Sequence, residues 1–143
     1  MRATIVLPAL AFLLLAWIAP TSMVDGDDHG PLESAMEELQ SGQRKLRKII
    51  SDPAQKDACL ETLRSMQRAA VTTLQNPIKS TTATDEKAKA VWRIGFQIQS
   101  AKLMVELLAC ELAVVEGRTD DAAKHYKELN AIKKAGHNAY QEE

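Results

Sequence analysis

Hydrophobic positions recur every three or four residues from Pro31 to the C-terminus, which is the spacing of amphipathic α-helices. Breaks in this pattern divide it into four predicted helices, over residues 31–50, 53–75, 84–116 and 119–141. No strand-like alternation competes with the helical period, and no internal repeat is evident. Two short connections and one longer one favour an all-α, antiparallel up-down-up-down four-helix bundle.

Residues that cap or break helices mark the expected ends. Pro53 suits the first turn of the second helix, and Asn76 is pushed out of the α region by the proline that follows it. Thr82 or Thr84 is expected to cap the third helix, and Gly117 suits the position just after its end.

The third predicted helix is the most apolar of the four. Its apolar stripe continues over about seven turns, and we expect this stripe to face the core. The stripe consists of Val91, Ile94, Ile98, Ala101, Val105, Leu108, Leu112 and Val115. The stripe is widened by Trp92, Phe96, Leu103, Leu107 and Cys110, and Trp92 and Phe96 are expected to face the core as well.

An apolar run from Ile5 to Ala19 precedes the helical region. These 15 residues are fewer than the roughly 20 that a membrane-spanning helix needs, and the run is typical of a signal peptide. We therefore expect residues 1–26 to be a signal peptide and leader, with the cleavage site left open, and an uncleaved N-terminal anchor as the alternative. The mature chain, residues 27–143, would then be periplasmic with no membrane span.

Charge and motif content argue against several functions. The chain has 18 Lys and Arg residues and 19 Asp and Glu residues, so no basic surface for a nucleic acid is expected. No histidine has a glutamate three residues before it, as a di-iron bundle would require, and no Cys-x-x-Cys-His motif for covalent haem occurs. Because no nucleophile–base pair or phosphate-binding loop is evident either, we do not expect an enzyme.

Four short motifs occur in order along the predicted helices. They are Met36-Glu37-x-Leu39, Arg93-x-Gly95-Phe96, Glu116-Gly117 and Asn138-Ala139-Tyr140. In this order they resemble the soluble cytochrome b-562 family, over essentially the whole mature chain. The resemblance implies a four-helix bundle that holds a non-covalent b-type haem and carries electrons, with a Met from the first helix and a His from the last helix as iron ligands.

The resemblance can be carried over for most of the cofactor site. Met36 corresponds to the Met ligand, and Leu39 belongs to the same motif and is expected to contact the cofactor. Trp92 and Phe96 correspond to the aromatic positions beside the ring. The redox partner protein that this function implies stays open.

The histidine ligand does not carry over, because Gln141 stands at its usual position and a neutral amide is not a usual ligand of haem iron. His137 lies four residues earlier and returns to nearly the same helix face. Met36 lies about 7.5 Å into the first helix and His137 about 9 Å from the end of the last, so an antiparallel bundle would bring them to similar depths. We therefore predict that Met36 and His137 are the iron ligands.

Two further expectations concern the cysteines and the overall function. Cys59 and Cys110 are at matching levels of consecutive helices, so we expect them to come within bonding range and to form a disulfide. The alternative is two small buried thiols at neighbouring levels. The alternative to a cytochrome is a haem-free periplasmic bundle that acts as a binding or structural module. In either case we expect a monomer or weak dimer.

Overall fold

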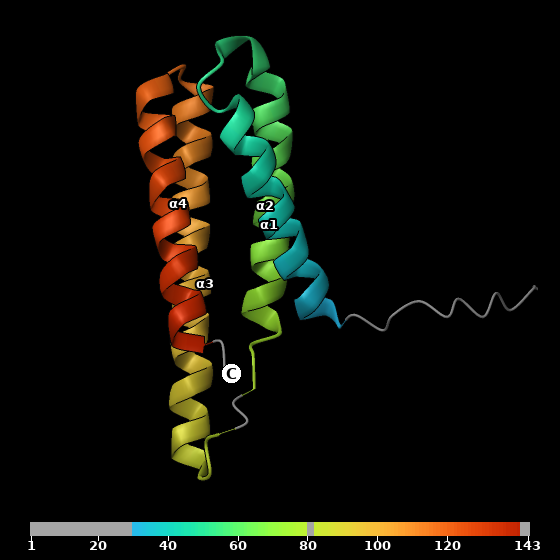
Figure 1. Cartoon of the computed structure of the whole chain (residues 1–143), viewed down its shortest axis with the longest axis vertical. Helices are drawn as coiled ribbons and strands as arrows, with labels where there is room; N and C mark the ends of the chain where they lie inside the picture. The colour runs from blue at the N-terminus through green and yellow to red at the C-terminus, as the bar shows by residue number, and fades with distance from the viewer. Residues whose placement is uncertain (1–29, 80–81, 141–143) are drawn as a thin grey trace, which may run out of the picture.

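The computed structural model describes residues 30–79 and 82–140 and is all-α (Figure 1). The helices are α1 (Pro31–Ile49), α2 (Lys56–Gln75), α3 (Glu86–Val115) and α4 (Thr119–Tyr140), and a short 3-10 turn, η1 (Pro53–Gln55), precedes α2. Each helix packs against the next one in sequence, as in an up-down bundle. The four-helix all-α fold is thus confirmed, whereas the predicted signal peptide and Gln141 lie outside the described residues.

Hydrogen bonds at the helix ends explain the observed bounds. The Asp52 side chain accepts a 3.0 Å bond from the backbone N–H of Ala54 at the start of η1. Asp85 caps α3 by accepting a 2.8 Å bond from the backbone N–H of Ala88, so the expectation of a threonine cap there was wrong. Gly117 has a positive φ of 74°, the left-handed conformation that ends α3 and lets α4 begin two residues later.

The core is made of side chains from all four helices. Leu46, Leu63, Met66, Leu107 and Leu129 are the largest apolar ones with no more than a trace of exposure. Close approach of α1 and α2 depends on Gly42, because the Met66 side chain fills the space that a Cβ at residue 42 would need. The packed part of the bundle therefore lies around these residues, away from the free ends of α1 and α4.

The apolar stripe expected to bury α3 instead faces solvent. Val91 is 64% exposed and Val105 is 66% exposed, and the other large members of the stripe are about half exposed. The residues of α3 that are buried are Phe96, Ser100, Leu107, Cys110, Ala113 and Val114. Phe96, Leu107 and Cys110, which widen the predicted stripe, are buried, whereas the regular row of eight was assigned to the wrong side. Periodicity could not separate the two because α3 is apolar over much of its circumference.

The first and last helices separate at one end of the bundle. The start of α1 leans away from the end of α4 in Figure 1, and the contacts between these two helices are far sparser than those between neighbours in sequence. This separation opens the bundle at the level of Met36 and His137. Across residues 30–79 and 82–140, no helix is long and apolar enough to cross a membrane.

Candidate functional site

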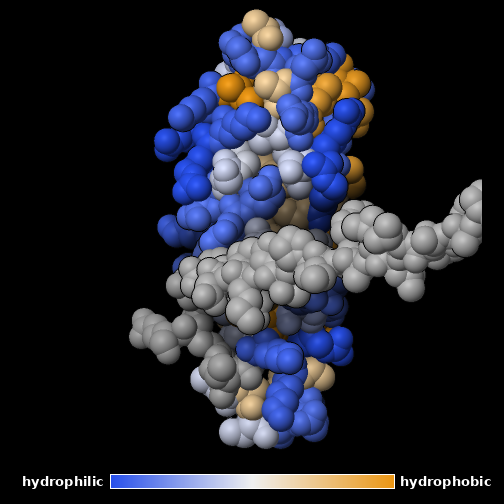
Figure 2. Space-filling view, turned by 90° about the vertical axis from the view of Figure 1, so that its right-hand side faces the viewer, coloured by the Kyte–Doolittle hydropathy of each residue, from blue (hydrophilic) through white to orange (hydrophobic). Residues whose placement is uncertain are grey.

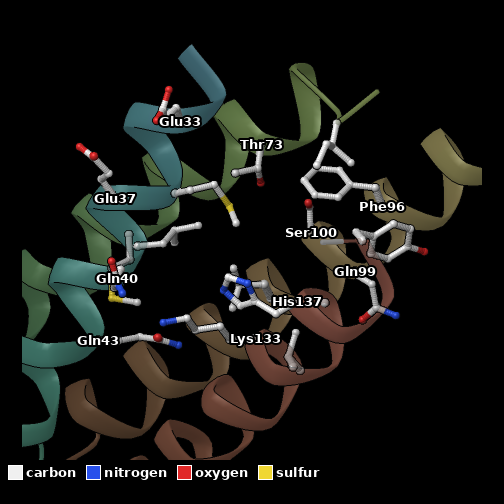
Figure 3. A pocket seen from close by; sticks show the side chains of 18 residues that line it. Glu33, Glu37, Gln40, Gln43, Thr73, Phe96, Gln99, Ser100, Lys133 and His137 are labelled. Atoms are coloured by element: carbon white, nitrogen blue, oxygen red, sulfur yellow. The ribbon is translucent and has the colours of Figure 1, made fainter. Parts of the chain in front are cut away.

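A cavity of about 400 Å³ lies where α1 and α4 separate (Figure 3). All four helices contribute to its walls, and most of its lining is apolar. Its size is within the range of pockets that bind small molecules and cofactors, about 300–1,000 Å³. The apolar side chains on its walls include Leu39, Met66, Phe96, Leu103 and Ile132.

Met36 and His137 both line this cavity, from α1 and α4 respectively. Figure 3 shows the His137 ring reaching from α4 into the middle of the cavity. Met36 is 39% exposed because the bundle is open at this end. The two predicted ligands therefore share one cavity, with a thioether on one side and an imidazole on the other.

Of the three residues predicted to contact the cofactor, two line the cavity and one lies outside it. Leu39 and Phe96 line the cavity, but Trp92 does not. The Trp92 ring packs edge-on against Tyr140, with ring centroids 5.1 Å apart and an interplanar angle of 81°. Trp92 is thus one layer removed from the cavity, behind an aromatic side chain that does line it.

Tyr140 is a lining residue to which the sequence assigned no role at the site. Its ring also packs edge-on against Phe96, with centroids 5.7 Å apart. Its hydroxyl oxygen occupies the place where a Cβ on Gly95 would lie, so a larger residue there would force the Tyr140 ring to move. Two of the four sequence motifs, Gly95-Phe96 and Asn-Ala-Tyr, are in contact at Tyr140, so the motifs could have indicated its place at the site.

Buried polar groups form part of the cavity wall. Gln43 donates a 3.4 Å hydrogen bond from its side chain to the backbone oxygen of Leu129, and its own backbone oxygen accepts one of 3.2 Å from the Tyr126 hydroxyl. Thr73 donates a 2.8 Å bond to the backbone oxygen of Ala70. Gln43 and Thr73 are polar residues on the otherwise apolar faces of α1 and α2. This pattern could have identified the wall, but neither residue was predicted to lie at the site.

Charged side chains surround the mouth of the cavity. Figure 3 shows Glu33 and Glu37 on α1 pointing away from the middle of the cavity, whereas Lys133 reaches from α4 toward α1. A ligand with negative groups would therefore find its favourable contact on the α4 side. The residues that the structure describes contain no group of three or more His, Cys, Asp or Glu side chains able to hold a metal ion.

His125 and the two cysteines lie outside this cavity. The Nδ1 of His125 contacts the Glu106 carboxylate on α3, a pair that joins α3 to α4. Cys59 and Cys110 are buried free thiols, so the structure lacks the disulfide considered from the sequence. Their Sγ atoms donate to different backbone oxygens, at 3.4 Å to Ile49 and 3.6 Å to Ala122.

Burial raises the pKa of both thiols. The pKa of Cys110 rises to about 12, because the side chain is desolvated and because Cys59 and Glu106 lie near enough to disfavour a thiolate. The pKa of Cys59 is also raised, mainly by burial and further by Asp52. The thiolate is the form that acts as a nucleophile or metal ligand. Because the raised pKa values keep both cysteines protonated, neither is expected to react in the folded protein.

The fold and the cavity define the class of this protein as an all-α four-helix bundle that is open at one end. Comparison with protein-family models gives no match, so no family model supports the resemblance to the cytochrome b-562 family. No curated protein matches the chain. No solved structure matches it either.

Proposed function

We propose that the open end of this bundle binds a b-type haem between Met36 and His137, and that the protein is a periplasmic cytochrome b-562-like electron carrier. The observation that carries the proposal is that both side chains line the same cavity, one from α1 and one from α4. They are 101 residues apart in sequence, so only the fold brings them to the same cavity.

The residues of the cavity fit such a group in three respects. A thioether and an imidazole are a ligand pair found in electron-carrying cytochromes. The apolar walls, with Phe96 and Leu39 among them, suit a flat hydrophobic ring. Lys133 provides a positive charge for carboxylates at the mouth, while Glu33 and Glu37 are unfavourable there.

The bound haem would supply one-electron chemistry at its iron. The Met36 thioether is a weak donor, and methionine ligation of this kind raises the reduction potential. His137 would supply the stronger nitrogen donor from α4. The apolar walls would lower the polarity around the ring, while the open end would leave one side of the site accessible to water, and both features tune the potential.

Optical titration with haemin tests the proposal. The chain starting at Asp27 should give a sharp low-spin spectrum on reduction, because Met36 and His137 would both be ligands of the iron. Met36→Leu and His137→Ala should each convert that spectrum to a high-spin form and weaken binding at least about 10-fold, as expected for loss of one ligand. His125→Ala is the matched control, because His125 is on the same helix as His137 but pairs with Glu106 outside the cavity.

Several results would reject the haem proposal. Failure of haemin to bind the folded chain would do so, as would an unchanged spectrum in either the Met36 or the His137 variant. A spectrum lost equally in the His125 control would point to another histidine pair or to nonspecific binding.

One observation favours a second function for the same cavity. Trp92 packs against Tyr140 instead of lining the cavity, so one of the two aromatic contacts expected for haem is absent from the wall. A haem-free bundle would bind a small, mainly apolar molecule against the remaining apolar walls, with Gln99 and Ser100 as hydrogen-bonding groups. Binding of an apolar fluorescent dye that Leu103→Trp blocks, together with no haemin spectrum, would support this alternative.

A further inference from the structure

The outer face of α3 is a continuous apolar surface that no other described helix covers. Its large side chains are between 47% and 66% exposed. They are Val91, Ile94, Ile98, Val105, Leu108, Leu112 and Val115. The exposed Ala101 completes the row, and we call these eight residues the α3 seam.

Spacing along the α3 seam alternates strictly between three and four residues, which is a heptad repeat over four heptads. Val91, Ile98, Val105 and Leu112 occupy one core position of the heptad, and Ile94, Ala101, Leu108 and Val115 occupy the other. This repeat is characteristic of a helix that packs lengthwise against another helix. Within the described residues, α2 and α4 pack elsewhere on α3, so the repeat has no partner inside the bundle.

Polar contacts border the α3 seam on both sides. Glu106 pairs with His125 of α4 on one side, and Glu111 pairs with Arg64 of α2 at 2.8 Å on the other. An apolar centre with a polar border is the usual composition of a protein–protein interface. By contrast, the face shown in Figure 2, on the side of α1 and α2, is mostly hydrophilic.

We propose that a second copy of this chain packs against the α3 seam, so that two α3 helices form a short antiparallel coiled coil. The seam is about 36 Å long, because it spans 24 residue steps of 1.5 Å. Seven half-exposed side chains offer on the order of 500–600 Å² of apolar surface, at the upper end of what single chains leave uncovered. Two such faces, if fully covered, would bury roughly 1,000–1,200 Å², which reaches the lower limit for a specific interface.

Two further features of the α3 seam, its end charges and its symmetry, favour one orientation of the pair. Lys87 continues the exposed face at its start. Glu116 continues it at its end, where its carboxylate also pairs with Arg118 of the same chain at 2.6 Å. A parallel pair would bring Lys87 beside Lys87 and Glu116 beside Glu116, whereas an antiparallel pair brings opposite charges together at both ends. Antiparallel packing also makes the interface two-fold symmetric, with the same surface used by both copies.

The antiparallel arrangement has one register that pairs all eight residues. In that register Val91 lies beside Val115 of the partner subunit, and Ala101 lies beside Val105 of the partner subunit. Each layer then joins the two different core positions of the heptad, and the small Ala101 faces a larger valine in the two central layers. This defined register allows a direct test by cross-linking.

Sedimentation of the chain starting at Asp27 tests the partner, since all the core residues lie between Ala35 and Leu129 and are retained. A concentration-dependent dimer is expected. Val105→Asp should weaken it at least about 100-fold, because a charge would be buried without a partner. Val71→Asp is the matched control, an exposed valine on α2 outside the α3 seam, and should leave the dimer unchanged.

Engineered cysteines test the orientation. After oxidation the double variant V91C/V115C should form a covalent dimer, whereas each single variant should stay uncross-linked. Cross-linking of single V91C would overturn the antiparallel arrangement.

Three results would show that a second copy does not pack against the α3 seam. A monomer at every concentration, or a dimer that Val105→Asp leaves intact, would overturn the proposal. A dimer found only in the full 143-residue chain and absent from the chain starting at Asp27 would also overturn it, and would assign the association to the first 26 residues instead.

Discussion

The open end of the bundle and the outer face of α3 are both apolar, and neither is covered by another described helix. They differ in shape. At the open end, α1 and α4 separate and leave a concave space with a thioether and an imidazole on its walls. Along α3 the surface is convex and regular, with no donor groups among its eight seam residues. A concave apolar site with a few polar groups suits a small molecule, whereas a long convex stripe suits another helix. The same kind of side chain therefore serves different partners according to how the backbone arranges it.

The largest expected effect comes from two adjacent leucines of α3, which test whether one face of this helix is in the core and the other is exposed. Leu107 is fully buried and Leu108 is 50% exposed. Leu107→Ala should lower the free energy of unfolding by about 3 kcal/mol, because it leaves a cavity in the core. Leu108→Ala should lower it by less than about 1 kcal/mol in the monomer.

Urea unfolding at low protein concentration measures both values. Equal effects at the two positions would mean that the face of α3 assigned to the core is wrong. At high protein concentration the cost of Leu108→Ala should grow if the seam is covered by a second copy, because the dimer stabilises the fold by mass action.

A smaller effect is expected from two glycines near the open end. Ala at Gly95 would collide with the Tyr140 hydroxyl, whereas Ala at Gly136 would meet nothing within 4 Å. Gly136→Ala should therefore stabilise the chain by about 0.5–1 kcal/mol through helix propensity. Gly95→Ala should be less stable than Gly136→Ala by about 1–3 kcal/mol, because the ring must move.

Thermal unfolding of the two variants gives this difference. If both glycines behave alike, Tyr140 does not pack over Gly95 in solution, and the aromatic wall of the cavity is not fixed as described.

The smallest effect concerns Glu111 at the border of the α3 seam. A hydrogen bond from Gln67, and then the hydrogen bond and charge of Arg64, lower the pKa of the Glu111 carboxyl. A lowered folded pKa adds stability that is present above the unfolded pKa, about 4.3, and is lost as the pH falls through the folded value. Glu111→Gln should therefore cost roughly 1 kcal/mol at pH 7 and less at pH 3.

Urea unfolding at the two pH values measures this change. Glu86→Gln is the control, because the Glu86 side chain is 91% exposed in its pair with Lys89 and such pairs contribute little. A cost for Glu111→Gln that does not depend on pH would show that the carboxylate charge is not what stabilises this border.

Much of the fold could be predicted from the sequence because its signals are local. Helical spacing, Pro53 and Gly117 define where helices begin and end without reference to the rest of the chain. The shared cavity of Met36 and His137 also followed from local counting, since depth from a helix end fixes the level in an antiparallel bundle.

The face that α3 buries could not be predicted in this way. Leu107 and Leu108 are identical residues on different faces, and only packing against α2 and α4 decides between them. The heptad row was the more regular pattern and was therefore assigned to the core. The displaced position of Trp92 was missed for a related reason, because its contact with Tyr140 joins two helices that are distant in sequence.

The edge-on stack of Trp92 on Tyr140 has one practical consequence. The chain contains two tryptophans, Trp17 and Trp92, so a chain that starts at Asp27 keeps only the latter. The Trp92 indole nitrogen is buried, with no hydrogen-bond partner among the described residues, and its neighbour Tyr140 borders the cavity. Fluorescence emission from this single indole thus reports on the open end of the bundle without any added label.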